Sequence, residues 1–246
     1  MQDRPWFKDW FNSPYYHQLY FKRNEAEAAH FIDQLIDHLK PAPNAKILDV
    51  ACGKGRHSIY LSKKKFDVTG IDLSEESIAE ALKCETENLH FYTHDMRLPF
   101  WINHFDIAFN FFTSFGYFQT PKEHNNAIRT IAQSLKNNGS FVLDYLNPQY
   151  AEAHQEKPFE IKIDRVNYLI TKSMDKTHFY KKIMVEDQSL DQLFIYNEQV
   201  AKFTLRDFEM MFYQQGLQIN EVMGDYNLSA YDVVKSPRLI LIATKK

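Results

Sequence analysis

The sequence has few cysteines, few glycines and no strong excess of charge of either sign. Cys52 and Cys84 are the only two cysteines among 246 residues, and they have neither CxxC spacing nor a nearby pair of histidines. Neither a zinc site nor a disulfide framework is therefore indicated, and two reduced thiols are expected. The 29 basic and 32 acidic residues leave a net charge of −3, without a long basic block. This pattern argues against a nucleic-acid partner.

Long hydrophobic runs are also lacking. No apolar run is long enough to cross a bilayer, and the first residues lack the uninterrupted apolar segment of a signal peptide. We therefore expect a cytoplasmic protein with no membrane partner. With 44% hydrophobic and 25% charged residues, the composition is typical of a globular protein. The length suits one α/β domain with an insertion.

Strand-like and helix-like segments alternate through the first 147 residues. Apolar residues on one face predict a helix from Asn24 to Lys40, and Ser74 is a candidate N-cap for a later one. Further helices are expected at 56–64, 75–83 and 121–136, and strands at 46–51, 66–72, 88–95, 105–112 and 140–147. This alternation is typical of parallel βαβ units with right-handed crossovers.

After residue 147 the pattern changes to period two. The runs 160–174, 178–187 and 191–203 predict a three-stranded antiparallel insertion. Thr204 with Asp207 then predicts a capped helix ending at Gly216, and two final strands follow. The predicted fold is thus a Rossmann-like, doubly wound α/β sheet of seven mostly parallel strands, with an antiparallel insertion after the fifth.

A glycine turn follows the first predicted strand. Gly53 and Gly55 are two of only seven glycines, and glycine lets a backbone approach a ligand closely. A dinucleotide-binding G-x-G-x-x-G motif needs a third glycine where this chain has Ser58. Asp72, at the end of the next strand, could bind the ribose of a dinucleotide or of another nucleoside cofactor. Asp72 alone therefore does not decide between these two cofactor classes.

The segment LDVACGKG, at 48–55, and the segment VTGIDLS, at 68–74, together resemble the S-adenosylmethionine-binding core of the class I methyltransferases. The resemblance implies a loop under the methionine and ribose portions of the cofactor, formed by Asp49, Ala51, Cys52, Gly53 and Gly55. It implies that Asp72, followed by Leu73, binds the ribose hydroxyls. Many members have glycine in place of Ala51, and alanine should be tolerated there if its φ is negative.

The segment THDMRLPF, at 93–100, extends the resemblance. It implies that Asp95 meets the adenine amino group and that Met96 lies beside the ring. The segment NFFTSFGYF, at 110–118, resembles a small-molecule branch that includes sugar N-methyltransferases, which would place Asn110 and Phe111 at the methionine end of the cofactor. Motifs of base, glutamine and pyrimidine-carbon methylation are absent.

The first 21 residues hold eight aromatic side chains. We expect Tyr15, Tyr16 and Tyr20 to face the site, with Tyr20 at the cofactor, while Trp6, Phe7, Trp10 and Phe11 pack against the domain. Arg23 either pairs with the methionine carboxylate of the cofactor or is solvated. The chain then divides into an aromatic and helical cap (1–40), a cofactor-binding core (41–150), an insertion covering the acceptor (151–203) and a segment completing the core (204–246).

The predicted function is transfer of a methyl group by in-line displacement to a nitrogen or oxygen atom of a small molecule. Asp144 is the candidate base and Tyr117 a second candidate catalytic residue. No metal is required, and the protein is expected to be a monomer or homodimer. A non-catalytic protein that binds S-adenosylmethionine, a nicotinamide-dependent dehydrogenase and a protein acceptor remain as alternatives.

Overall fold

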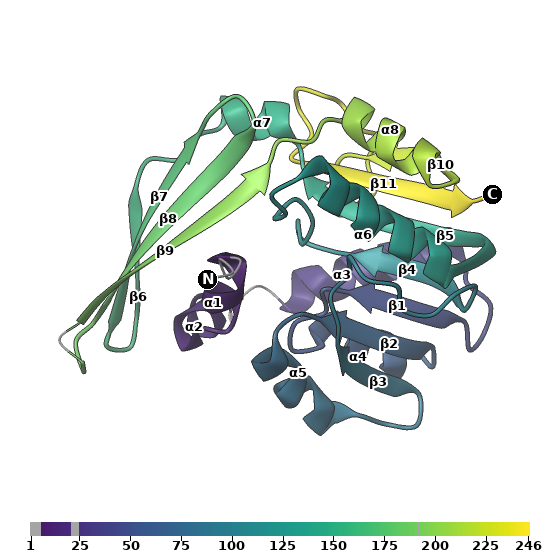
Figure 1. Ribbon diagram of the computed structural model, residues 1–246, viewed down its shortest axis with the longest axis horizontal. Helices are drawn as coiled ribbons and strands as arrows, with labels where there is room; N and C mark the ends of the chain where they lie inside the picture. Colours follow the sequence, from purple (N-terminus) through teal and green to yellow (C-terminus); the bar gives the residue numbers. More distant parts are fainter. Residues whose placement is uncertain (1–5, 21–24, 191) are drawn as a thin grey trace.

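The computed structural model describes residues 6–20, 25–190 and 192–246 and contains two β-sheets (Figure 1). The larger sheet has seven strands in the order β10-β11-β5-β4-β1-β2-β3. These strands are β1 (Lys46–Val50), β2 (Asp67–Asp72), β3 (Leu89–Thr93), β4 (Phe105–Asn110), β5 (Leu135–Leu146), β10 (Leu217–Met223) and β11 (Arg238–Lys245). The first five are parallel, and β11 pairs antiparallel with β5 and β10. The predicted fold class is confirmed.

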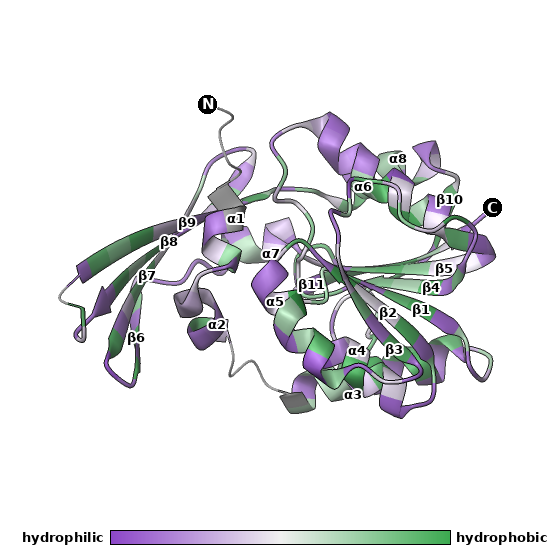
Figure 2. Cartoon of the chain, turned by 60° about the horizontal axis from the view of Figure 1, so that its bottom comes forward, coloured by the Kyte–Doolittle hydropathy of each residue, from purple (hydrophilic) through white to green (hydrophobic). Residues whose placement is uncertain are grey.

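Helices cover both faces of this sheet. The helices α3 (Glu25–Leu39), α4 (Arg56–Lys63) and α5 (Glu75–Ala81) pack on one face, and α6 (Pro121–Ser134) and α8 (Leu205–Gln214) on the other. A short 3₁₀ helix, η1 (Leu82–Cys84), follows α5. Figure 2 shows the hydrophobic central strands between helices whose outer faces are hydrophilic. Two hydrophobic clusters, one on each face, therefore hold the sheet in place.

Local sequence signals fix several helix starts. Ser74 caps α5 by accepting a hydrogen bond from the backbone N–H of Ser77. Thr120 and Thr204 each form a capping box, with Glu123 and Asp207 respectively. Such caps satisfy backbone N–H groups that have no partner within the helix. The predicted N-caps at Ser74 and Thr204 are confirmed.

The second sheet forms a cap beside the larger one (Figure 1). It has four antiparallel strands, β6 (Phe159–Ile163), β7 (Val166–Met174), β8 (His178–Asp187) and β9 (Gln192–Ala201). The prediction of three strands was wrong. Asp164 has a φ of 53° and turns the chain between β6 and β7. The apolar alternation shifts by one residue at this turn, from Ile161 and Ile163 to Val166 and Tyr168, but no glycine or proline marks the break. A short helix, α7 (Pro148–Ala153), joins β5 to the cap.

Two N-terminal helices, α1 (Trp6–Phe11) and α2 (Pro14–Tyr20), pack on the cap sheet. Trp10 and Tyr15 join Val166, Tyr168 and other buried cap residues in a third hydrophobic cluster. The N-terminus of the chain thus completes the core of a sheet formed more than 140 residues later. Within the described ranges, no helix is long and apolar enough to cross a membrane.

Candidate functional site

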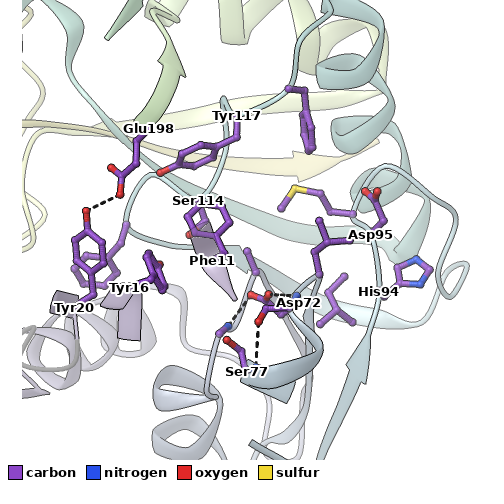
Figure 3. A pocket seen from close by; sticks show the side chains of 18 residues that line it. Phe11, Tyr16, Tyr20, Asp72, Ser77, His94, Asp95, Ser114, Tyr117 and Glu198 are labelled. Atoms are coloured by element: carbon purple, nitrogen blue, oxygen red, sulfur yellow. Dashed lines mark hydrogen bonds between the residues drawn. The ribbon is translucent and has the colours of Figure 1, made fainter. Parts of the chain in front are cut away.

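The site lies where the strand order of the large sheet reverses, between β1 and β4. In open α/β sheets, ligands bind at the carboxyl ends of the strands beside such a point. A cavity of about 160 Å³ opens there (Figure 3). Its walls come from the loop after β1, the ends of β2 and β3, the loop after β4, the N-terminal helices and β9.

The loop after β1 carries three residues in the left-handed region. The φ values are 61° at Ala51, 56° at Gly53 and 80° at Gly55. Ala51 does not meet the condition of a negative φ, because this turn needs a left-handed residue directly after β1 whichever side chain it carries. A Cβ atom added to Gly53 would meet no heavy atom within 4 Å, whereas one added to Gly55 would meet the ring of Phe91 at 2.5 Å. Gly53 therefore lines the cavity, and Gly55 lets the loop pack on the core.

Asp72 holds this loop against the end of β2. Its Oδ2 accepts the backbone N–H of Gly53 at 2.8 Å, and its Oδ1 accepts that of Ser74 at 2.8 Å. Burial raises the pKa of Asp72, although these N–H groups oppose the shift. Each carboxylate oxygen keeps acceptor capacity for a further O–H donor. The side chain lines the cavity, as a ribose-binding carboxylate would require.

Asp95 and Met96 also line the cavity. Arg97 donates to both oxygens of Asp95, through Nε at 3.0 Å and 3.1 Å and through Nη2 at 2.6 Å, and it pairs with Glu123 as well. Burial opposes ionisation of Asp95, but the bonds from Arg97 outweigh it and lower the pKa of this carboxyl. Asp95 is therefore an ionised, oriented acceptor at the end of the cavity opposite β9.

The other walls are aromatic and carry one more carboxylate. Tyr16, Tyr20 and Phe11 enter from the N-terminal helices, Tyr117 from the loop after β4, and Glu198 from β9 (Figure 3). Glu198 is 9% exposed, and its Oε1 accepts the N–H of Trp10 and the O–H of Tyr20, each at 2.7 Å. Lys181 Nζ lies 3.9 Å from Glu198 Oε2. The cap thus presents one anchored carboxylate to the cavity.

The expectations for the aromatic segment need correction at two residues. Tyr15 does not face the site, because its ring is buried against the cap and its hydroxyl donates to Asp187 at 2.9 Å. Phe11, expected to pack away from the site, lines it. Tyr16 and Tyr20 line the cavity as expected, and Trp10 packs in the cap. The side chains of Trp6 and Phe7, and Arg23, lie outside the described part of the chain.

Asp144 was predicted as the base, and its environment contradicts this. The side chain is 0% exposed and does not line the cavity. Its Oδ1 pairs with Arg238 at 2.6 Å and 2.7 Å, while its Oδ2 accepts the N–H of Phe112 at 2.8 Å and the hydroxyl of Tyr226 at 3.2 Å. Asp144 is therefore a structural residue that fixes the loop after β4.

Several predicted cofactor residues lie behind the cavity wall rather than on it. Asp49 is buried and accepts the hydroxyl of Ser58 at 2.6 Å, and burial, with Asp72 adding to it, raises its pKa to about 6. Asn110 is buried and donates to the Val50 carbonyl at 3.0 Å. Neither side chain lines a cavity, so both brace the loop after β1. Ala51, Gly53 and Leu73 line the first cavity, and Cys52 and Phe111 line a second one beside it.

Sequence reasoning missed Glu198, Ser77 and Phe118 among the lining residues. Glu198 lies in a strand with alternating polar and apolar residues, where a single glutamate gives no signal. Its partners Trp10 and Tyr20 are 188 and 178 residues away. Only the fold brings these groups together. Among the residues with described positions, no three His, Cys, Asp or Glu side chains are grouped to hold a metal ion.

Comparison with known proteins adds independent findings. Residues 47–139 match a family model described as a methyltransferase domain. A Bacillus subtilis (strain 168) protein named as the methyltransferase YqeM is 27% identical over 209 residues, covering 81% of this chain and 84% of the relative. The Streptomyces venezuelae dTDP-3-amino-3,4,6-trideoxy-alpha-D-glucopyranose N,N-dimethyltransferase is 30% identical over 119 residues, which is 48% of this chain and 49% of that relative. The chain thus spans about half the length of the second relative.

A solved structure shares the whole architecture. The sugar N-methyltransferase KedS8 from Streptoalloteichus sp ATCC 53650 superposes with a TM-score of 0.73 at 18% identity, covering 94% of this chain and 92% of the other. The likeness therefore includes the cap as well as the large sheet.

The sheet order and the carboxylates at its strand ends define an α/β enzyme with a nucleoside-cofactor site. The family model and the relatives narrow that class: residues 47–139 match a methyltransferase domain, and the relatives are named as methyltransferases, which favours S-adenosylmethionine as the cofactor. The dehydrogenase alternative is thereby set aside.

Ala51→Gly is expected to raise the free energy of unfolding by about 0.5–1 kcal/mol, because relief of the left-handed strain exceeds the entropy cost of glycine. Chemical denaturation measures the change. The matched control is Ala81→Gly at the end of α5, where φ is −62°, and it should lower stability by about 1 kcal/mol or more. Destabilisation by both variants would show that Ala51 is unstrained.

Asp144→Asn is expected to lower the free energy of unfolding by about 3 kcal/mol, because the largely buried Arg238 guanidinium loses its counter-charge. Urea titration followed by circular dichroism checks this. Glu156→Gln breaks the exposed pair between Lys172 and Glu156 and should change stability by about 0–1 kcal/mol. Equal, small effects of the two variants would contradict a structural role for Asp144.

Proposed function

We propose that this enzyme methylates a nitrogen atom of a small molecule, with the cofactor bound along the first cavity and the acceptor between the cofactor and the cap. The observation that carries this proposal is the position of Glu198 and Tyr117, which lie across the cavity from Asp72 (Figure 3). One wall carries hydrogen-bond acceptors suited to a nucleoside. The facing wall carries hydrogen-bonding groups suited to a second ligand.

The cavity fits the cofactor in three ways. Gly53 leaves open space where any other residue would place a Cβ atom. Asp72 has acceptor capacity for the ribose hydroxyls, and Asp95 has capacity for the adenine amino group, since a carboxylate offers about four lone pairs. Met96 and Leu73 supply apolar surface between these two acids. We assign these residues to the cofactor, with Tyr20 closing the methionine end.

The acceptor side favours a nitrogen nucleophile. Phe11, Tyr16 and Tyr117 form an aromatic wall, and rings of this kind attract cationic groups. Glu198 is the carboxylate on that wall, and it is held in place by Trp10 and Tyr20. An amine is cationic at neutral pH, so this combination binds it better than it binds an alcohol.

The bound cofactor supplies an electrophilic methyl carbon on a sulfonium. The protein must align the acceptor with that carbon, and such positioning contributes up to about 7–11 kcal/mol in model systems. An amine must release a proton to expose its lone pair, and we assign Glu198 as the group that receives it, with Tyr117 orienting the nitrogen. The aromatic wall excludes water that would compete with the acceptor.

The names of two similar proteins support a nitrogen acceptor. One relative methylates an amino group of a sugar nucleotide, and the superposed structure is a sugar N-methyltransferase. The second of these covers the cap as well as the core, which is the part of the fold that faces the acceptor.

Asp72→Asn is expected to weaken binding of S-adenosylhomocysteine by about tenfold to a hundredfold, because a charge-assisted hydrogen bond contributes about 1.5–3 kcal/mol. Calorimetric titration measures it. Asp67→Asn is the matched control, since Asp67 is a half-exposed residue at the other end of β2. An unchanged affinity in a folded Asp72→Asn protein would remove Asp72 from the cofactor site.

Glu198→Gln is expected to raise the KM for an amine acceptor by about tenfold or more, because glutamine keeps the acceptor oxygen for Trp10 and Tyr20 but loses the charge. A panel of small amines and their matched alcohols, assayed with methyl-labelled cofactor, identifies a usable acceptor first. Glu186→Gln, on an exposed residue of β8, should leave the KM unchanged. Methylation of alcohols alone would refute a nitrogen acceptor.

A further inference from the structure

A second cavity of about 440 Å³ adjoins the first. It lies between α2, α3, the loop after β1, α4 and the loop after β4. The charged side chains on its wall are Lys54, Arg56 and Lys63, joined by the imidazoles of His17 and His57. No Asp or Glu is among its described lining residues. The cavity is therefore basic.

The two cavities adjoin and have opposite charge. They share seven lining residues, among them Gly53, Phe112 and Ser114. The first cavity is lined by the carboxylates of Asp72, Asp95 and Glu198, and no Lys or Arg lines it among the described residues. A ligand that crosses from one to the other passes from acidic to basic walls.

The cations of the second cavity are held by their surroundings. The Arg56 guanidinium lies 5.3 Å from the centroid of the Phe112 ring, and its Nη2 lies 3.2 Å from His57 Nε2. The buried His57 ring stacks on Phe112 at 5.2 Å with an interplanar angle of 12°. Stacking of this kind orients the planar Arg56 group for a bidentate anion contact.

Acidic residues near this cavity are bonded elsewhere. Glu80 on α5 interacts electrostatically with Lys54 and His17, but its carboxylate bonds to Lys83 at 2.7 Å. Asp33 on α3 bonds to Lys64 at 2.6 Å. Glu80 and Asp33 therefore each have a cation partner of their own, while Glu76 lies within electrostatic reach of His17.

We propose that the basic cavity binds a phosphate group of the acceptor. This rests on the proposed function, since it adds a second recognition point to an amine held by Glu198. Three permanent cations exceed the charge of one carboxylate and match a phosphate dianion, and Arg is suited to bidentate phosphate recognition. Ala28, Ile32 and Ile59 provide an apolar wall for the remainder of the molecule. The substrate class is thus a small phosphorylated amine.

The experiment is calorimetric titration of inorganic pyrophosphate, inorganic phosphate and acetate into the protein saturated with S-adenosylhomocysteine. Saturation matters because the carboxylate of the cofactor is the competing anion for these cations. Arg56→Gln removes the stacked cation, Arg56→Lys keeps the charge without the planar group, and Lys63→Gln removes a second cation. Lys122→Gln, on an exposed residue of α6, is the charge-matched control.

Pyrophosphate is expected to bind the saturated protein at least about tenfold more tightly than acetate. Arg56→Gln and Lys63→Gln should each weaken it by about tenfold, with partial recovery in Arg56→Lys and no change in Lys122→Gln. Absence of pyrophosphate binding, equal binding of acetate, or an equal loss in the control would overturn the proposal.

One further result would overturn the proposal: pyrophosphate competes with S-adenosylhomocysteine, and Arg56→Gln weakens binding of S-adenosylhomocysteine. The cations would then serve the cofactor. The proposed function fails differently. In that case the panel of amines and alcohols would yield no methylated amine, whatever the anions do.

Discussion

The buried pair of Asp144 and Arg238 determines where the loop after β4 runs, and both cavities depend on that loop. Asp144 accepts the N–H of Phe112, and Arg238 donates to the hydroxyl of Thr113 at 3.0 Å. Phe112 and Thr113 both have left-handed backbones, with φ values of 54° and 57°. Such conformations persist where surrounding bonds fix them. The pair therefore places Phe112, which lines both cavities and supports Arg56.

Much of the fold could be predicted from the sequence, because its signals are local. Apolar periodicity located the helices and strands of the large sheet, and the caps at Ser74 and Thr204 follow from neighbouring residues. The turn at Asp164 was missed because no glycine or proline marks it and the only signal is a one-residue shift in the apolar alternation. The left-handed backbone at Ala51 could not be predicted, because backbone strain leaves no mark in composition.

The site divides into a part that sequence could reveal and a part that it could not. Asp72 and Asp95 lie in segments whose order and spacing resemble a known family, and the structure places both on one cavity. Asp144 likewise lies near the carboxyl end of a strand, yet an arginine 94 residues later neutralises it. Glu198 depends on contacts with the opposite end of the chain. Burial and long-range pairing, not residue type, separate these carboxylates.

The dependence of the cap on α1 and α2 has a consequence for the order of folding. Trp10 and Glu198 are 188 residues apart, so the cap cluster closes one of the longest loops in the chain. Contacts of such separation form late, because the chain entropy of closure opposes them until other structure has shortened the path. During synthesis the N-terminal helices emerge first and wait for the cap strands. The wall formed by Glu198 and the N-terminal aromatic rings is therefore expected to be completed after the wall that carries Asp72 and Asp95.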